Sequence, residues 1–249
     1  MIETWFYALV SVFIVSLISL VGIFTLSIKA KKLNKILIYF VSFSAGALLA
    51  DAFVHLLPSV IKTNGFNLTI SLSLLSGILL FFVLEKVIKW RHCHDSECTE
   101  HVHSFAYMNI FGDAVHNFID GLIIAASYMV SIPVGIATTM AVIFHEIPQE
   151  IGEFGLLLYG GFSKTRALLV NFLSALTAIL GAVVGLLLAG AFSNIQEILV
   201  PIAAGGFIYI AGSDLIPEMH KETKLSKSLI QILALLAGIV VMIALLALE

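Results

Sequence analysis

The chain has 249 residues, of which 60% are hydrophobic and only 12% are charged, and its mean hydropathy is +1.07. A soluble domain usually carries about 25% charged residues, so this composition excludes an ordinary soluble protein and predicts a membrane protein. The formal net charge of -3 offers no basic surface for a nucleic acid, and no Walker A pattern is present that would bind ATP.

A bilayer crossing takes roughly 20 apolar residues, and several stretches of the chain meet this length. In chain order they cover residues 4–28, 36–58, 68–89, 105–129, 132–159, 166–190, 199–217 and 228–248. We therefore predict an all-α polytopic membrane protein: a single transmembrane domain of eight helices, with the lipid bilayer as its environment. The first stretch carries Glu3, has no basic segment before it and is too long for the apolar part of a signal peptide, so we expect it to be retained.

The basic residues predict the orientation. All 13 except Lys62 fall in or beside the connections that follow helices one, three, five and seven: Lys29, Lys31, Lys32, Lys35, Lys86, Lys89, Arg91, Lys164, Arg166, Lys221, Lys224 and Lys227. Basic connections stay in the cytoplasm. Both termini are therefore expected outside the cytoplasm, in a plasma membrane or a bacterial inner membrane.

Helices two and seven contain similar sequences. Residues 44–47 read Ser-Ala-Gly-Ala and 56–58 read Leu-Leu-Pro, while residues 203–206 read Ala-Ala-Gly-Gly and 215–217 read Leu-Ile-Pro, at the same spacing. Because the two helices run in opposite directions, we predict inverted three-helix repeats, helices one to three and six to eight, on either side of helices four and five. Small residues are common in any membrane helix, so a chance similarity stays an alternative.

Two polar motifs lie at the centres of helices four and five. The first is His116-Asn117-Phe-Ile-Asp120-Gly and the second is His145-Glu146-Ile-Pro-Gln149-Glu. A charge at mid-depth costs roughly 2.5–3.5 kcal/mol on insertion scales, so such groups pair, bind an ion or line a water path. Imidazole, carboxylate and amide groups together suit a divalent transition metal.

Helical spacing predicts how these groups meet. Residues i and i+4 share a face, so His116 pairs with Asp120 and His145 pairs with Gln149. A short turn joins the two antiparallel helices, and we expect these four side chains to surround one ion, with Asn117 and Glu146 offset along the path. An interhelical hydrogen-bond cluster is the structural alternative, but six polar groups at one depth fit it poorly.

Pro148 is the proline that lies inside a predicted helix rather than at a helix end. It removes the hydrogen bond to the carbonyl of Phe144 and is expected to kink helix five. The released carbonyl then needs a polar neighbour, or faces the site itself.

These motifs resemble signatures of the ZIP (Zrt-, Irt-like protein) family of eight-helix metal-ion transporters. Residues 116–121 are similar to the helix-four signature HNFxDG, and residues 145–150 to the helix-five signature HExPHE, followed by Ile, Gly and an acid. The resemblance implies that six residues line the metal site: His116, Asn117, Asp120, His145, Glu146 and Gln149. It also implies inward transport of zinc or a similar ion. Gln149 departs from the family's His or Glu, and helix six has no acid that would help hold a second ion.

Other polar residues predict accessory roles. Asp51 and His55 share a face near the outer end of helix two and suggest an entrance station, or interfacial polar groups. Acidic residues on the cytoplasmic side of the site suggest an exit funnel, or solvated helix ends: Asp113, Glu150, Glu153, Asp214 and Glu218. Residues 91–104 form a predicted cytoplasmic loop whose His92–His103 tract holds two Cys and four His, which suits a flexible metal catcher or a merely polar loop.

We therefore predict a secondary transporter that imports a divalent metal ion, most plausibly Zn²⁺, with Fe²⁺, Mn²⁺, Cd²⁺ and Co²⁺ as alternatives. No enzyme activity and no resident cofactor are expected. An intramembrane zinc-dependent hydrolase with Glu146 as base is the alternative from another class, although residues 145–149 do not form HExxH. A metal-sensing receptor without flux is a third reading. A homodimer is compatible with the sequence.

Overall fold

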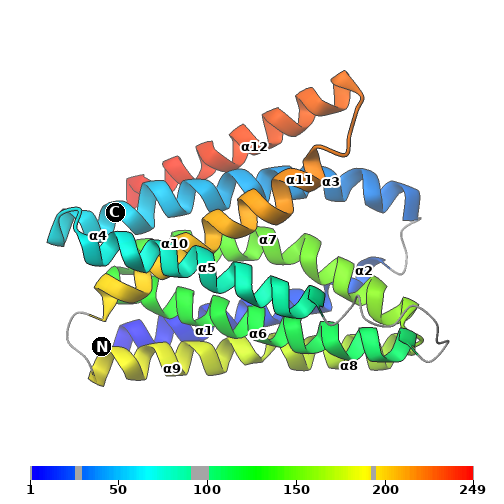
Figure 1. Ribbon diagram of the computed structural model, residues 1–249, viewed down its shortest axis with the longest axis horizontal. Helices are drawn as coiled ribbons and strands as arrows, with labels where there is room; N and C mark the ends of the chain where they lie inside the picture. The colour runs from blue at the N-terminus through cyan, green and yellow to red at the C-terminus, as the bar shows by residue number, and fades with distance from the viewer. Residues whose placement is uncertain (1, 26–29, 91–100, 192–194, 249) are drawn as a thin grey trace.

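The computed structural model describes residues 2–25, 30–90, 101–191 and 195–248, and the regular secondary structure in these ranges is entirely helical (Figure 1). The predicted all-α polytopic membrane fold is confirmed. Within the described ranges, seven helical stretches are long and apolar enough to span a membrane. The stretch outside this set is α7 (Ile132–Tyr159), whose hydropathy is lowered by polar residues that include His145, Glu146 and Gln149.

The helices follow the predicted order, with several internal breaks. The first rod contains α1 (Ile2–Ile18), a 3₁₀ turn (Ser19–Val21) and α2 (Gly22–Thr25); the second contains α3 (Ala30–Ala50), a π-helical turn (Asp51–Leu56) and α4 (Leu57–Asn64); α5 (Leu68–Trp90), α6 (His101–Val130) and α7 come next. The sixth rod is split into α8 (Lys164–Ala175) and α9 (Thr177–Ala191). The seventh contains α10 (Gln196–Tyr209), a second π-helical turn (Ile210–Leu215) and α11 (Ile216–Met219), and the last is α12 (Leu225–Leu245) with a 3₁₀ turn (Leu246–Leu248).

The predicted loop over residues 91–104 is wrong at its C-terminal end. Residues 101–104 belong to the first turn of α6, which begins at His101. Helices in membrane proteins continue into water wherever their backbone bonds remain favourable, so an apolar count underestimates their length. The His/Cys tract before His101, at residues 92–100, lies outside the described residues, as does the end of the first predicted helix at residues 26–28.

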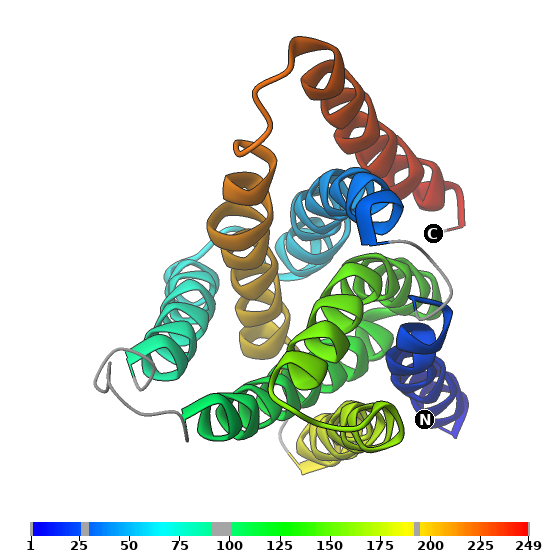
Figure 2. The ribbon, with the colours of Figure 1, turned by 90° about the vertical axis from the view of Figure 1, so that its right-hand side faces the viewer.

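Two groups of helices make up the molecule. In one group α6 packs along α9 and α7, and α1 packs against α7 and α9; in the other, α3 packs along α12 and α10 packs along α5. Contact between α3 and α7 joins the groups, and the end-on view in Figure 2 shows α6 and α7 near the centre of the assembly. This arrangement surrounds the two motif-bearing helices with other helices.

Glycines set the close approach of the second group, and they do so twice in the same way. A Cβ at Gly46 of α3 would collide with the carbonyl oxygen of Leu235 in α12, and one at Gly238 would collide with that of Phe43. A Cβ at Gly205 of α10 would collide with the carbonyl oxygen of Leu74 in α5, and one at Gly77 would collide with that of Ile202. The pair α3–α12 therefore repeats in α10–α5 at the same registers, as small residues at membrane helix interfaces allow.

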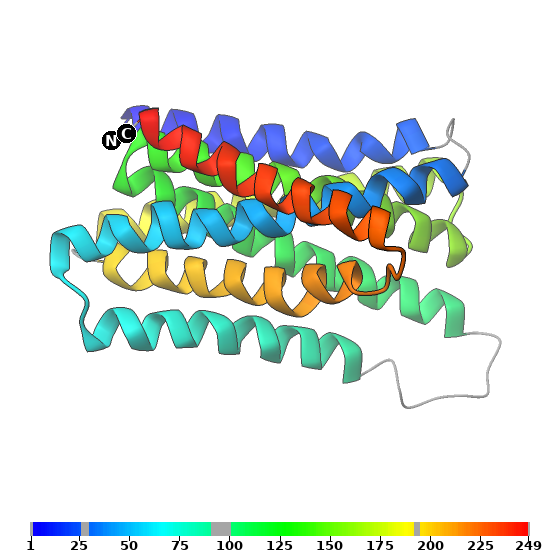
Figure 3. The same cartoon turned by 90° about the horizontal axis from the view of Figure 1, so that it is seen from above.

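The π-helical turns occupy equivalent places in this repeat. Asp51–Leu56 follows Gly46, and Ile210–Leu215 follows Gly205, at the same spacing; each turn leads into a short helix with proline near its start. Figure 3 shows the α3–α4 rod and the α10–α11 rod running in opposite directions. These features agree with an inverted relation between helices two and seven, because the similarity extends to the backbone and to the neighbouring helix.

Pro148 lies inside α7, and the carbonyl that it releases has the expected polar neighbour. The hydroxyl of Ser44 on α3 donates to the carbonyl oxygen of Phe144, at 2.5 Å between the two oxygens. Ser44 also donates to the carbonyl of Phe40 in its own helix. The proline in the second motif thus creates a hydrogen bond between α7 and the neighbouring helix group.

Candidate metal site

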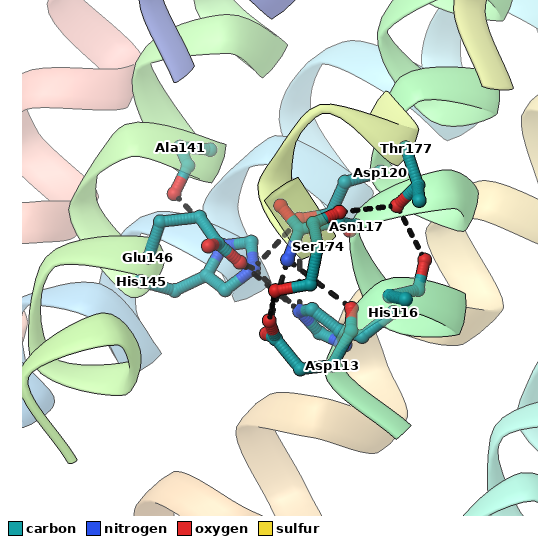
Figure 4. A network of polar contacts seen from close by, with 10 residues as sticks. Asp113, His116, Asn117, Asp120, Ala141, His145, Glu146, Ser174 and Thr177 are labelled. Carbon is teal, nitrogen blue, oxygen red and sulfur yellow. Dashed lines mark hydrogen bonds and ion pairs between the residues drawn. The ribbon is translucent and has the colours of Figure 1, made fainter. Parts of the chain in front are cut away.

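Four side chains from α6 and α7 converge at the middle of the molecule. One ligand atom from each of His116, Asp120, His145 and Glu146 lies within 4.8 Å of the others. Asp120, Glu146 and His145 are buried, and His116 is partly exposed to the adjacent cavity. Figure 4 shows the imidazoles and carboxylates of this group, which we call the four-residue cluster, pointing toward one another.

The separations within the four-residue cluster suit one tetrahedral ion. The Nε2 atoms of the two histidines are 3.3 Å apart. The Oε1 atom of Glu146 lies 3.2 Å from Nε2 of His116 and 3.3 Å from Nε2 of His145, and the Oδ2 atom of Asp120 lies 3.6 and 3.1 Å from the same two nitrogens. Ligands about 2.0–2.1 Å from a tetrahedral Zn²⁺ lie roughly 3.3–3.4 Å from one another. Five edges of such a tetrahedron are therefore close to the required length.

The carboxylates of the four-residue cluster have the two imidazoles as their close polar neighbours. Nε2 of His145 lies 3.1 Å from the Oδ2 atom of Asp120, and Nε2 of His116 lies 3.2 Å from the Oε1 atom of Glu146. Nδ1 of His145 lies 3.3 Å from the carbonyl oxygen of Ala141, a contact that directs Nε2 toward the carboxylates. Two buried carboxylates close to each other are costly, and a cation bound between the four side chains would offset that cost.

Aromatic rings border the two imidazoles. The ring of Phe81 on α5 meets His116 edge-on with centroids 6.4 Å apart, and the ring of Phe207 on α10 lies 6.2 Å from that of His145. Phe207 is fully buried. These rings come from the repeat-related helices, so the second helix group restricts the space around the imidazoles.

Two of the six predicted residues lie beside the four-residue cluster rather than in it. The Nδ2 atom of Asn117 donates to the backbone oxygen and the Oδ1 atom of Asp113, at 3.1 and 3.0 Å. Gln149 lines the cavity together with Asp113. The prediction that Glu146 is offset from the centre is wrong: its carboxylate reaches both imidazoles, because a long side chain can turn back across the roughly 100° between neighbouring helix positions.

A cavity of about 400 Å³ leads away from His116 and His145. Five acids line it: Glu85, Asp113, Glu153, Asp214 and Glu218. Asp113 precedes His116 on α6 and Glu153 follows His145 on α7, so this wall faces the same end as the connections after α5, α7 and α11. Eight of the 13 basic residues lie in or beside those connections.

The predicted funnel residues divide into two kinds. Glu150 does not line this cavity: it is buried, and the Nδ2 atom of Asn171 on α8 donates to its Oε2 atom. Glu85 lines the cavity although sequence reasoning passed over it, and the hydroxyl of Tyr209 donates to its carboxylate. The packing of α5 against α10 places Glu85 on the cavity wall, and the packing of α7 against α8 places Glu150 against Asn171.

Asp51 and His55 lie in the first π-helical turn and are buried. Nε2 of His55 is 2.8 Å from the carbonyl oxygen of Met242 on α12. The π-helical turn that carries them packs against α10, α3 and α7 as well as α12. The entrance role and the interfacial role both remain predictions.

Hydrogen bonds from α8 and α9 hold the turn of α6 that precedes His116. The sequence analysis did not predict them. The hydroxyl of Ser174 donates to the Oδ2 atom of Asp113, and the hydroxyl of Thr177 donates to the carbonyl oxygen of Ala114 (Figure 4). Serine and threonine are ordinary in membrane helices, where they often bond their own backbone. Their spacing alone gave no signal that they reach α6.

Comparison with known proteins gives a consistent family assignment. The family described as "ZIP Zinc transporter" matches residues 2–105 and 91–246. The chain is 35% identical to zinc transporter ZIP13 of Pongo abelii over 81% of its own length and 64% of the relative's. It is 30% identical to zinc transporter zipt-7.1 of Caenorhabditis briggsae, with 80% and 68% covered, and 26% identical to zinc transporter SLC39A7 of Canis lupus familiaris, with 100% and 72% covered.

The membrane-spanning helices of the described ranges, the His/Asp/Glu cluster between them and the family match define a polytopic metal-ion transporter, not an enzyme. The chain belongs to the ZIP zinc transporter family. It spans between 64% and 72% of the length of the three relatives named above.

Proposed function

We propose that this protein imports Zn²⁺ through the four-residue cluster into the cytoplasm of the cell. The observation that carries the proposal is the set of five separations of 3.1–3.6 Å among two imidazoles and two carboxylates. Borderline nitrogen ligands with carboxylate oxygens at tetrahedral spacing favour Zn²⁺ over larger, oxygen-loving ions such as Ca²⁺. Fe²⁺, Mn²⁺, Cd²⁺ and Co²⁺ are competitors that the same ligands would accept.

The ion would leave through the acid-lined cavity. His116 belongs both to the four-residue cluster and to the cavity wall, so an ion released from it would enter the acidic space directly. With the basic connections in the cytoplasm, this cavity is the cytoplasmic exit, both termini are outside, and transport runs inward. A dication gains about 4.6 kcal/mol on moving through 100 mV into a negative interior, which would drive import without ATP.

Uptake of ⁶⁵Zn²⁺ into proteoliposomes tests the proposal. The purified protein is expected to accelerate uptake above that of empty liposomes, and an inside-negative potential set with K⁺ and valinomycin should increase the initial rate. Competition with unlabelled Fe²⁺, Mn²⁺, Cd²⁺ and Co²⁺ ranks the ions. Uptake no faster than in empty liposomes, from protein that binds Zn²⁺ and is correctly inserted, would support a metal receptor instead.

The hydrolase alternative would need a substrate in the cavity beside the four-residue cluster, with Glu146 free to act as base. The cavity lining next to His116 and His145 includes Val41, Phe81, Val115 and Ile119. Glu146, which would serve as base in a hydrolase, contacts both imidazoles. A carboxylate held against the ion's other ligands is suited to bind the ion rather than to move protons, which favours transport.

A further inference from the structure

Asp113 accepts hydrogen bonds from its own helix and from α8, but it does not belong to the four-residue cluster. Asn117 on its own helix donates to Oδ1, and Ser174 on α8 donates to Oδ2. Asp113 is buried, with only 5% of its surface exposed, at the cluster end of the acidic cavity.

The contacts of Asn117 define which way its amide faces. Its Nδ2 atom lies 3.1 Å from the backbone oxygen of Asp113 and 3.0 Å from the carboxylate oxygen of the same residue. Both neighbours are acceptors, so the reverse orientation would place Oδ1 against two other oxygens and is unfavourable. The hydrogen bonds therefore identify the nitrogen and the oxygen of this amide.

The oxygen of the amide is left in a buried place without a donor. Oδ1 of Asn117 forms no hydrogen bond to a described residue, and Asn117 is fully buried. Because Nδ2 is turned back toward Asp113, four residues earlier, Oδ1 points away from Asp113, and Figure 4 shows Asn117 between Asp113 and Asp120. An unsatisfied buried carbonyl of this kind costs about 1–3 kcal/mol, and a cation near Asp120 would offset that cost.

From this geometry we propose that Asp113 is a positioning residue, which turns the amide oxygen of Asn117 toward the transported ion. Ser174 fixes Asp113 from α8, and Asp113 in turn fixes Asn117. Asp113 thus acts on the ion through an amide, as the hydrogen-bonded partners of metal ligands do in many sites. The inference rests on the proposed function, since it assigns a role in Zn²⁺ binding.

A double-mutant cycle separates positioning from direct contact. Zn²⁺ uptake by proteoliposomes and equilibrium Zn²⁺ binding in detergent are measured for Asp113→Ala, Asn117→Ala and the double variant. Loss of a residue that orients a metal ligand typically reduces affinity about 10- to 100-fold. Asp113→Ala should raise the KM and the Kd by this factor in the native background, and by no more than about twofold when Asn117 is already alanine.

Asp113→Asn supplies the conservative rescue. An asparagine at this position keeps an oxygen that can accept from Asn117 but removes the charge, so positioning predicts a KM close to that of the native protein. Glu153→Ala is the matched control: it removes another acid from the cavity wall, and its effect should be the same with and without Asn117. If Asp113→Ala does not insert, Ser174→Ala replaces it, with Ser174→Thr restoring the hydroxyl.

Three results would overturn the inference. Equal effects of Asp113→Ala in the two backgrounds would mean that Asp113 meets the ion directly or only supports the fold. An Asp113→Asn variant as weak as Asp113→Ala would assign the role to charge, and an Asn117→Ala variant with native KM would remove Asn117 from the site. In each case the native protein still transports Zn²⁺; absence of flux in the native protein would instead reject the proposed function.

Discussion

The helix pair α6–α7 and the surrounding helices α3, α5, α10 and α12 differ in the polar side chains that they carry into the core. The pair carries two imidazoles and two carboxylates within 4.8 Å of one another, at a depth where charge is costly. The surrounding helices approach through glycines against backbone oxygens, at registers that occur twice. Since α6 packs on α9 through the same kind of glycine contact, at Gly121 and Gly181, the buried polar cluster and not the close packing distinguishes the functional pair.

This comparison predicts the largest effect for the four-residue cluster. Asp120→Ala or His145→Ala removes a group that lies 3.1 Å from its partner in the cluster, so Zn²⁺ uptake should fall at least about 100-fold, in line with losing a metal ligand rather than a peripheral contact. Initial rates in proteoliposomes measure this. Thermal melting in detergent should stay near that of the native protein, and native uptake by both inserted variants would remove these residues from the site.

Gly46→Leu and Gly205→Leu should lower the stability of the protein, whereas the cluster variants lower its transport rate. Each introduces a side chain against a backbone oxygen, that of Leu235 or of Leu74, and a backbone oxygen cannot move aside without separating two helices. Overpacking commonly costs about 1–3 kcal/mol, and we expect both variants to show lower melting temperatures and poor yields. Gly152→Ala is the control, because no atom lies within 4 Å of its Cβ position. A fall in melting temperature at one of these two glycines but not at the other would contradict their equivalence in the repeat.

Gln149→His tests the boundary between the cluster and the cavity. Gln149 lines the cavity beside Asp113 and His145, and an imidazole at this position would offer Zn²⁺ a nitrogen ligand, which the ion prefers to an amide oxygen. We expect the KM for Zn²⁺ to fall about three- to tenfold, and the maximal rate to fall as release slows. Gln149→Glu should instead favour Mn²⁺. Initial uptake rates are measured against the concentrations of Zn²⁺ and Mn²⁺ for the native protein and both variants. The same KM and maximal rate in all three proteins would contradict this prediction.

Ser44→Ala is expected to have the smallest effect. It removes the hydroxyl that donates to the Phe144 carbonyl across the two helix groups, and hydrogen bonds between membrane helices average about 0.6 kcal/mol. The melting temperature should fall slightly, while the KM changes less than about twofold because no cluster residue loses a contact. Ser42→Ala is the control, because the Ser42 hydroxyl donates to the carbonyl oxygen of Ile38 in its own helix. A large loss of uptake would show that this bond also holds the site in place.

The amino-acid sequence by itself determined the membrane fold and the two motifs that carry the site. Hydropathy located the membrane helices because each crossing needs its own apolar run. The i, i+4 spacing placed His116 with Asp120 on one face because helix geometry is local. Pro148 likewise predicted a polar neighbour for the Phe144 carbonyl, since the missing backbone bond follows from proline alone.

Only the tertiary structure decided which polar groups meet between helices. It brought Glu146 into the cluster, left Gln149 on the cavity wall, buried Glu150 against Asn171 and connected Ser174 to Asp113. It also revealed the matching π-helical turns and the duplicated glycine contacts. These depend on the rotation and separation of packed helices, and many helix rotations satisfy the same apolar pattern. The amino-acid sequence therefore determines which side chains lie on each face of a helix, and the packing of the helices determines which residues those side chains contact.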